Sequence, residues 1–275
     1  MKRFVIALLV LVVAAVITAV AFGRQTHQVD EPIQSIALGG TAHALVVLPD
    51  GYATSGLRYP VVYFLHGLPA GPSAYKGSAW LGEVLERVGP AILVMPQGAR
   101  TGDTDAEYLN WGAGRNWETF IAEELPAAID KRFRTIRSRD GRALIGLSAG
   151  GFGATVDGLH HLGRFSVIES WSGYFHPTDP TGTQALDRGP LTSAHNLISV
   201  LKADEQRRST LFAFYVGDGD KRFLAENVQL NRELNAADVK HVFAIYSGGH
   251  TSALWQAHAR VWLGLALSRL DDATA

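Results

Sequence analysis

The sequence predicts an α/β fold in which helices cover both faces of a mostly parallel central sheet. Continuous apolar runs, of which PVVYFL at 60–65 is the clearest, are typical of strands buried on both faces. Between these runs lie segments with helical periodicity, such as 119–133, where apolar side chains recur on one face and glutamates enrich the early part. Strands that alternate with helices in this way favour parallel pairing.

The expected elements follow in order along the chain. An antiparallel pair at 35–38 and 42–48, turned at Gly39 and Gly40, precedes the first buried strand. Pro126 falls inside the helix expected at 119–133, where it fits within the first turns or as a kink. The other strands are expected at 91–95, 143–145, 165–169, 210–216 and 241–246, and the other helices at 81–88, 151–161, 223–235 and 252–270.

The sequence GLSAG at 146–150 follows a short apolar run and places a serine between two glycines. This G-x-S-x-G pattern is typical of a nucleophile elbow, a sharp strand-to-helix turn with the serine at its tip. Side chains at Gly146 or Gly150 would collide with a neighbouring strand or helix, since the serine sits in a strained backbone conformation. A Gly/Ser-rich loop without chemistry is the alternative, and the partners below favour Ser148 as the nucleophile.

Two other strand ends carry the partners that a serine nucleophile needs, because sites in parallel sheets lie at the carboxyl ends of strands. One predicted strand ends in GDGD, with Asp218 and Asp220, and the last ends in SGGH, with His250. The order Ser, Asp, His suits an elbow serine. His250 would accept the proton of Ser148, and a buried carboxylate would fix the imidazole tautomer. One of the two aspartates is expected to be a turn residue.

The strand at 60–65 ends in His66-Gly67-Leu68, which is the candidate oxyanion loop. A tetrahedral intermediate needs two backbone N–H donors arranged around its negative oxygen. Ala149, directly after the nucleophile, should supply one, and Leu68 is the candidate for the other. We expect His66 to brace this loop rather than to contact the substrate.

The composition excludes several classes of function. The chain has 275 residues, a net charge of −1 and no cysteine. Its charge gives no electrostatic basis for binding nucleic acid, and the lack of cysteine excludes disulfides, thiolate metal sites and a cysteine nucleophile. The remaining histidines form no metal-like cluster. We therefore expect neither a metal nor a cofactor.

The N-terminal residues 1–23 predict an export signal or a membrane anchor. Lys2 and Arg3 precede an uncharged apolar run at 4–23, which is long enough to cross a bilayer. The AVA sequence at 19–21 resembles the cleavage site of a signal peptide. The apolar run is longer than the hydrophobic region of most signal peptides, which favours an uncleaved anchor.

Residues 24–34 are polar, contain Pro32, and are interpreted as a linker. Residues 35–275 are expected to form a single domain. Its predicted location is outside the cytoplasm, either secreted or anchored to the outer face of the cytoplasmic membrane. Membrane association through residues 4–22 is one possible consequence.

Five segments of the chain form a recognisable set: YPVVYFLHG, GRNWETFIAEELPAAIDKRF, GLSAGGFGA, GDGD and GGHTSALW. Together they resemble the putative-esterase family of α/β-hydrolases, which includes esterase D-like enzymes, feruloyl esterases and secreted mycolyltransferases. The resemblance covers roughly residues 40–265 and implies the α/β-hydrolase fold. In this family the acid typically closes a Gly-x-x-Asp loop, which matches Gly217 and Asp220 and favours Asp220 over Asp218.

The resemblance implies a serine carboxylic-ester hydrolase that acts through an acyl-enzyme on a small-molecule, carbohydrate or lipid ester. Acyl transfer to a sugar or lipid acceptor is the alternative, although mycolyltransferases typically carry a glutamate where Asp220 stands. A non-catalytic cell-surface binding protein is the alternative from another class, and the presence of all three triad residues disfavours it.

Substrate contacts are the least defined part of the sequence prediction. The loops at 69–80 and 98–117 follow strand ends and should form walls of the pocket, and 175–209 could form a cap. Trp111 and Trp117 are the candidate substrate-binding residues, with ordinary core packing as the alternative. The aromatic residues of these two loops are Tyr75, Trp80, Tyr108, Trp111 and Trp117.

Overall fold

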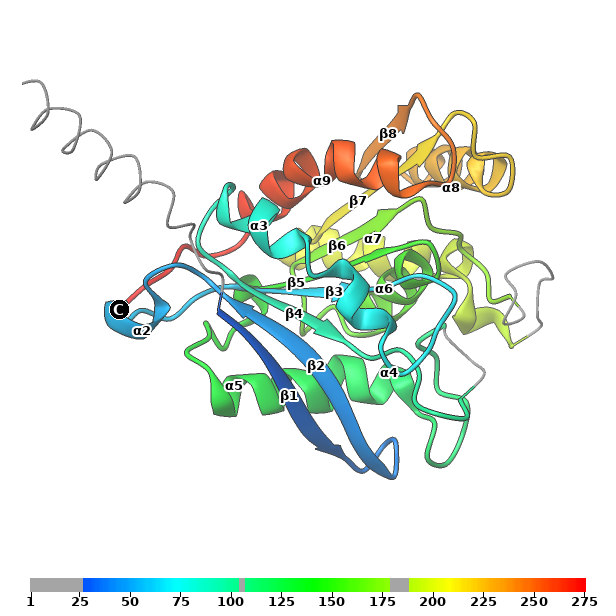
Figure 1. Ribbon diagram of the computed structural model, residues 1–275. Helices are drawn as coiled ribbons and strands as arrows, with labels where there is room; N and C mark the ends of the chain where they lie inside the picture. The colour runs from blue at the N-terminus through cyan, green and yellow to red at the C-terminus, as the bar shows by residue number, and fades with distance from the viewer. Residues whose placement is uncertain (1–26, 104–106, 179–187) are drawn as a thin grey trace, which may run out of the picture.

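The computed structural model describes residues 27–103, 107–178 and 188–275, which form an eight-stranded sheet with helices on both faces (Figure 1). The strand order in space is β1-β2-β4-β3-β5-β6-β7-β8. The pairs β1–β2 and β2–β4 are antiparallel, and all the other pairs are parallel. The strands are β1 (His27–Ser35), β2 (Gly40–Leu48), β3 (Val61–Leu65), β4 (Ile92–Pro96), β5 (Arg142–Leu147), β6 (Val167–Trp171), β7 (Leu211–Gly217) and β8 (Val242–Tyr246).

The helices connect these strands as the alternating pattern predicts. The α-helices are α2 (Tyr52–Ser55), α3 (Leu81–Glu86), α4 (Trp117–Thr119), α5 (Leu125–Arg132), α6 (Ala149–His160), α7 (Ile198–Arg208), α8 (Leu224–Ala236) and α9 (Ser252–Leu267). Short 3-10 helices lie at Ala74–Ser78, Arg139–Gly141, Pro190–Thr192 and Ala194–Leu197. Among the helices of the described ranges, none combines the length and apolar character needed to cross a bilayer.

Successive side chains of the central strands point to opposite faces of the sheet, so the core is divided between these two faces. On β5, Ala143 and Ile145 pack with α3 and α9, while Leu144 packs on the opposite face with α5. Figure 1 shows α3 and α9 together on one side of the sheet and α5 on the other. Because every residue from Val61 to Leu65 is buried, β3 shows the continuous apolar run that a strand covered on both faces requires. The α/β-hydrolase prediction is thereby confirmed in its layers and its mostly parallel sheet.

The linker predicted at 24–34 is wrong for residues 27–34, which belong to the edge strand β1. Most β1 side chains are exposed or half-buried, and backbone pairing from His27 to Ser35 holds the strand against β2. Its sequence, HQVDEPIQS, therefore lacks the apolar pattern by which strands are recognised. Pro32 is tolerated because an edge strand leaves one row of N–H groups unpaired. Residues 1–23, to which the signal-peptide or anchor prediction applies, lie outside the described residues.

The helix expected at 119–133 is present but is built from three helical segments. A π-helical segment at Phe120–Glu124 separates α4 from α5, which carries Pro126 in its first turn. Proline lacks an N–H and its ring crowds the carbonyl four residues earlier. A local widening of the helix to i→i+5 hydrogen bonds relieves this crowding and keeps the chain helical.

Candidate active site

The elbow at Ser148 joins β5 to α6 with the strained geometry that its glycines predict. Ser148 has φ 54° and ψ −122°, outside the regions that L-residues favour. A Cβ on Gly146 would lie 2.1 Å from the carbonyl oxygen of Gly150, and one on Gly150 would lie 2.1 Å from that of Leu65. The Ser148 N–H donates to the carbonyl of Trp171 at 2.9 Å, which fixes the turn to β6.

Ser148, His250 and Asp220 form one hydrogen-bonded chain at the carboxyl ends of β5, β7 and β8. Nε2 of His250 lies 2.9 Å from Oγ of Ser148, and Nδ1 lies 2.7 Å from Oδ2 of Asp220. The Asp220 side chain is 1% exposed and that of His250 13%. Because a carboxylate only accepts, Nδ1 carries the proton toward Asp220 and Nε2 accepts from the serine hydroxyl.

The two aspartates of the GDGD loop have different partners. Asp220 is buried and contacts His250, whereas Asp218 is exposed and accepts from the backbone N–H of Gly248 at 2.9 Å. Gly217 permits this arrangement, since a Cβ there would lie 2.2 Å from the carbonyl oxygen of Gly248. Asp218 thus ties the GDGD loop to the histidine loop, and the role of Asp220 as the acid stays a prediction.

Two aromatic side chains that the sequence prediction did not assign to the site flank the imidazole. The Phe223 and Trp255 rings lie 5.2 and 5.1 Å from the His250 ring, both in edge-on geometry. Phe223 is three residues after Asp220 in the sequence, and Trp255 is five after His250. Closeness in sequence to the predicted triad was therefore the signal that could have identified them. Their packing against the imidazole limits its rotation.

The predicted oxyanion loop lies directly against Ser148. A Cβ on Gly67 would come within 2.9 Å of both the Cβ of Ser148 and a methyl of Leu147, so only glycine fits. Leu68 follows it and is partly buried. The N–H of Ala149 belongs to the first turn of α6, whose amides have no partner within the helix. The donor roles of Leu68 and Ala149 stay predictions.

His66 braces this loop from a buried position. Its Nδ1 lies 2.8 Å from the carbonyl oxygen of Gly67, and the N–H of Gly98 donates to its Nε2 at 3.2 Å. Burial lowers the pKa of His66, and the acceptor role of Nε2 requires the neutral ring. This arrangement agrees with the expected bracing role of His66.

The two tryptophans proposed to contact substrate occupy different environments. Trp117 is completely buried in the core beside Phe120, so its expected substrate role is corrected to core packing. It begins α4, and its large apolar area is used to fix that helix against the sheet. Trp111 is partly buried, packs beside the cluster that contains Ala149, and has the Arg188 guanidinium 4.4 Å from its ring centre. Its substrate role stays a prediction.

Two adjacent histidines at the end of α6 share one carboxylate. Nδ1 of His160 and Nε2 of His161 lie 2.9 and 3.1 Å from Oε1 of Glu118. Although burial alone would raise it, these two bonds lower the pKa of Glu118 to about 2. Within 27–103, 107–178 and 188–275, no three His, Asp or Glu side chains are arranged to hold a metal ion.

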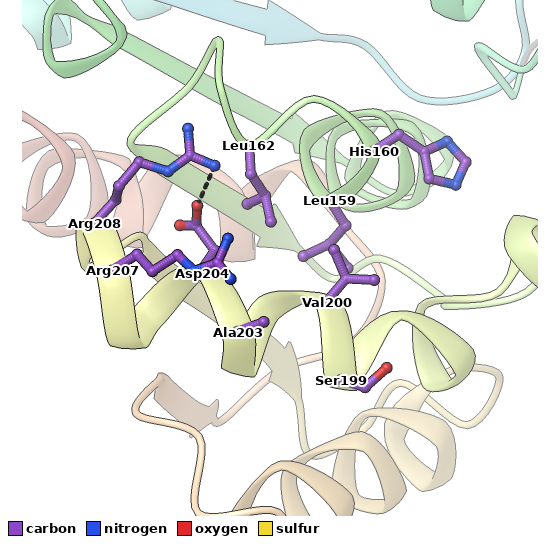
Figure 2. A pocket seen from close by; sticks show the side chains of 9 residues that line it. All are labelled: Leu159, His160, Leu162, Ser199, Val200, Ala203, Asp204, Arg207 and Arg208. Atoms are coloured by element: carbon purple, nitrogen blue, oxygen red, sulfur yellow. Dashed lines mark ion pairs between the residues drawn. The ribbon is translucent and has the colours of Figure 1, made fainter.

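A surface hollow of about 430 Å³ lies between the end of α6 and α7, away from the triad (Figure 2). Ser148 directly precedes α6, whereas Leu159 and His160 line the hollow at the opposite end of this 12-residue helix. At 1.5 Å rise per residue, the helix separates them by roughly 17 Å. None of the triad residues lines the hollow, and Asp204 and Arg208 form an ion pair within it.

The layered sheet, the serine elbow and the Ser–His–Asp geometry are those of the α/β-hydrolase class. The family described as putative esterase matches residues 35–259, and the chain belongs to it. This membership confirms the family resemblance and places the chain among enzymes of the ester-hydrolase type.

Known relatives and solved structures agree with this family. The chain is 38% identical over 141 residues to an esterase of Mycobacterium tuberculosis, which covers 51% of this chain but 31% of that relative. It thus spans about a third of that relative's length. Against the MPT51/MPB51 antigen of Mycobacterium bovis it is 31% identical over 133 residues, covering 46% of this chain and 42% of the antigen.

Among solved structures, a ferulic acid esterase matches with a TM-score of 0.75 and 25% identity, over 90% of this chain and 100% of that one. An S-formylglutathione hydrolase from Agrobacterium tumefaciens matches with a TM-score of 0.73 and 19% identity, over 90% and 97%. At 19% identity, the likeness to the S-formylglutathione hydrolase shows the fold alone.

Proposed function

We propose that this protein is a serine carboxylic-ester hydrolase in which Ser148 forms an acyl-enzyme. The hydrogen-bonded chain from Asp220 through His250 to Ser148 carries this proposal, because it provides the base and the orienting acid that a serine hydroxyl needs. Membership of the esterase family supports the same reaction class.

In the proposed mechanism each residue performs one step. His250 takes the hydroxyl proton at Nε2 as Ser148 Oγ attacks the ester carbonyl, and Asp220 stabilises the imidazolium that results. The N–H groups of Leu68 and Ala149 donate to the tetrahedral oxyanion. His250 then gives its proton to the departing alcohol, and an activated water releases the acid from Ser148 by the same steps in reverse order.

The proposed substrate is a small-molecule ester, which the likeness to a ferulic acid esterase supports. A test is the hydrolysis of p-nitrophenyl esters of increasing acyl length and of methyl ferulate, by residues 24–275. We expect turnover with a preferred acyl group, and the preference defines the acyl pocket. No turnover of any ester by folded protein would contradict the proposal.

Acyl transfer is the second candidate, because hydrolysis and transfer share the acyl-enzyme and differ only in the acceptor. The same assay with a sugar or glycerol acceptor separates them. Hydrolysis predicts that the acceptor leaves the rate and products unchanged. Faster turnover with a transesterified product would instead establish a transferase.

We also propose that the domain works outside the cytoplasm, secreted or anchored by residues 4–22. The support is the basic pair and long apolar run at 1–23. Fractionation of cells that express the full chain tests this, and N-terminal sequencing of the exported protein distinguishes a cleaved signal from an anchor. Recovery in the cytoplasm alone would contradict the proposal.

A further inference from the structure

Tyr108 lies at the meeting point of three segments that shape the active site. It is fully buried, and its hydroxyl donates to the backbone carbonyl of His66 at 2.8 Å. Its backbone has φ 61°, a left-handed conformation that costs energy for an aromatic residue. Surrounding contacts must outweigh this cost, so the position of Tyr108 is strongly specified.

Two glycines on different elements form the space for the Tyr108 ring. A Cβ on Gly98, in the loop after β4, would lie 2.7 Å from the Tyr108 hydroxyl oxygen. A Cβ on Gly153, in α6, would lie 2.6 Å from the ring. Gly153 is five residues after Ser148 in the nucleophile helix. The ring is therefore held between that helix and the Gly98 loop.

In this position Tyr108 contacts the oxyanion loop through His66. The two rings pack edge-on with centres 5.8 Å apart, and the Tyr108 hydroxyl holds the carbonyl that precedes Gly67. Gly67 in turn lies against the Cβ of Ser148. A shift of the His66 carbonyl would pass along two peptide units to the N–H of Leu68.

We propose that Tyr108 is a positioning residue that fixes the oxyanion loop relative to the nucleophile helix. The inference rests on the proposed esterase function, because the loop has a catalytic role only if an oxyanion forms beside Ser148. Tyr108 touches no reacting atom. It acts by holding the Leu68 N–H where the developing charge appears, and a preorganised donor is effective only at that position.

The test compares Tyr108→Phe with Tyr59→Phe, which also removes one buried hydroxyl. The Tyr59 hydroxyl lies 2.6 Å from Oγ of Ser55, and Tyr59 precedes β3, at the end of the sheet opposite to the site. Loss of an oxyanion donor costs 10²–10³ in kcat, so a displaced donor should cost about tenfold. We expect this loss, with an unchanged KM, in Tyr108→Phe alone.

A phenylboronic acid, which forms a tetrahedral adduct with serine, provides the second measurement. Its affinity should fall in Tyr108→Phe by the same factor as kcat/KM, while both variants lose similar thermal stability. A wild-type kcat in Tyr108→Phe, an unchanged boronate affinity, or an equal loss of kcat in Tyr59→Phe would each overturn the proposal.

Hydrogen exchange of a peptide that contains residues 66–68 separates this inference from the proposed function. Tyr108→Phe should exchange these amides faster than wild type, and Tyr59→Phe should not, whether or not any ester is hydrolysed. Equal exchange would overturn the positioning role even in an active esterase. If Tyr108→Phe proves insoluble, Gly98→Ala displaces the same hydroxyl and should give the same pattern.

Discussion

The Asp220 carboxylate lies 2.7 Å from Nδ1 of His250, whereas Asp218, two residues earlier, accepts from the backbone N–H of Gly248. The amide of Asp220→Asn can donate to Nδ1 and so favour the wrong imidazole tautomer. We therefore expect Asp220→Asn to lower kcat by about 10⁴-fold and Asp218→Asn by less than about tenfold. Steady-state kinetics of both purified variants tests this. The reverse ranking would contradict the assignment of the acid.

The close approach at Gly150 makes the elbow intolerant of any side chain. A Cβ there would lie 2.1 Å from the Leu65 carbonyl oxygen, whereas one on exposed Gly77 would have nothing within 4 Å. Gly150→Ala should cost about 3 kcal/mol or more and lower Tm by roughly 6–12 °C. Gly77→Ala should leave Tm within about 2 °C. Calorimetry that finds equal Tm values for the two variants would refute the close contact.

Buried Glu169 should make the protein less stable as the pH rises. Burial raises its pKa from 4.5 to about 8, although the Trp171 indole N–H donates to it at 3.0 Å. Between these values the unfolded state releases a proton that the folded state keeps, so stability falls with increasing pH, by on the order of 4 kcal/mol at the upper end.

Replacement by the neutral isostere isolates this effect. Denaturant unfolding of Glu169→Gln should match wild type near pH 5 and show greater stability near pH 9. Glu83→Gln, at an exposed position, serves as the control and should follow wild type throughout. A constant difference between Glu169→Gln and wild type across this range would exclude titration of Glu169 as the cause.

A histidine–glutamate cluster ties two histidines of segment 175–209, the predicted cap, to α8. His176 and His195 both contact Glu226, and His195 also contacts Glu233. The hydrogen bond to Glu226 raises the pKa of His176. Burial alone would lower the pKa of His195, but its hydrogen bonds to Glu226 and Glu233 raise it. Groups with raised folded pKa values stabilise below the unfolded value near 6.5 and lose this contribution as the pH rises through the folded one.

The cluster should therefore stabilise most between about pH 4.5 and 6.5, because the pKa of Glu226 is lowered by the same bonds despite its burial. We expect Glu226→Gln to lower Tm more at pH 5.5 than at pH 9. Thermal scans at both values measure the difference. An equal loss of Tm at the two pH values would show that the charges of this cluster contribute nothing.

The strands and the triad could be predicted because their physical requirements leave local sequence patterns. Burial on both faces demands an unbroken apolar run, and the elbow demands glycine on each side of Ser148. The strand ends then placed Asp220 and His250 at one edge of the sheet. Edge strand β1 could not be recognised, because its stability comes from backbone pairing and leaves the side chains polar.

Contacts between residues far apart in the sequence leave no comparable local pattern. Tyr108 meets His66 across 42 residues, and Glu118 meets His160 across the same separation. Trp117 and Trp111 are six residues apart in one loop region, yet one is core and the other partly exposed. The sequence shows that aromatic residues occur in a loop near the site. It does not show whether each side chain points into the core or into the pocket, because that depends on packing which the local sequence does not encode.

The acyl-enzyme on Ser148 is the central claim, and rapid-mixing kinetics with mass spectrometry of the digested protein tests it most directly. A p-nitrophenyl ester mixed with the protein should give a burst of about one nitrophenolate per active site if deacylation limits turnover. Acid quenching should then show the acyl mass on the peptide that contains Ser148, and Ser148→Ala should show neither burst nor adduct. An adduct on another residue, or full turnover by Ser148→Ala, would contradict the mechanism.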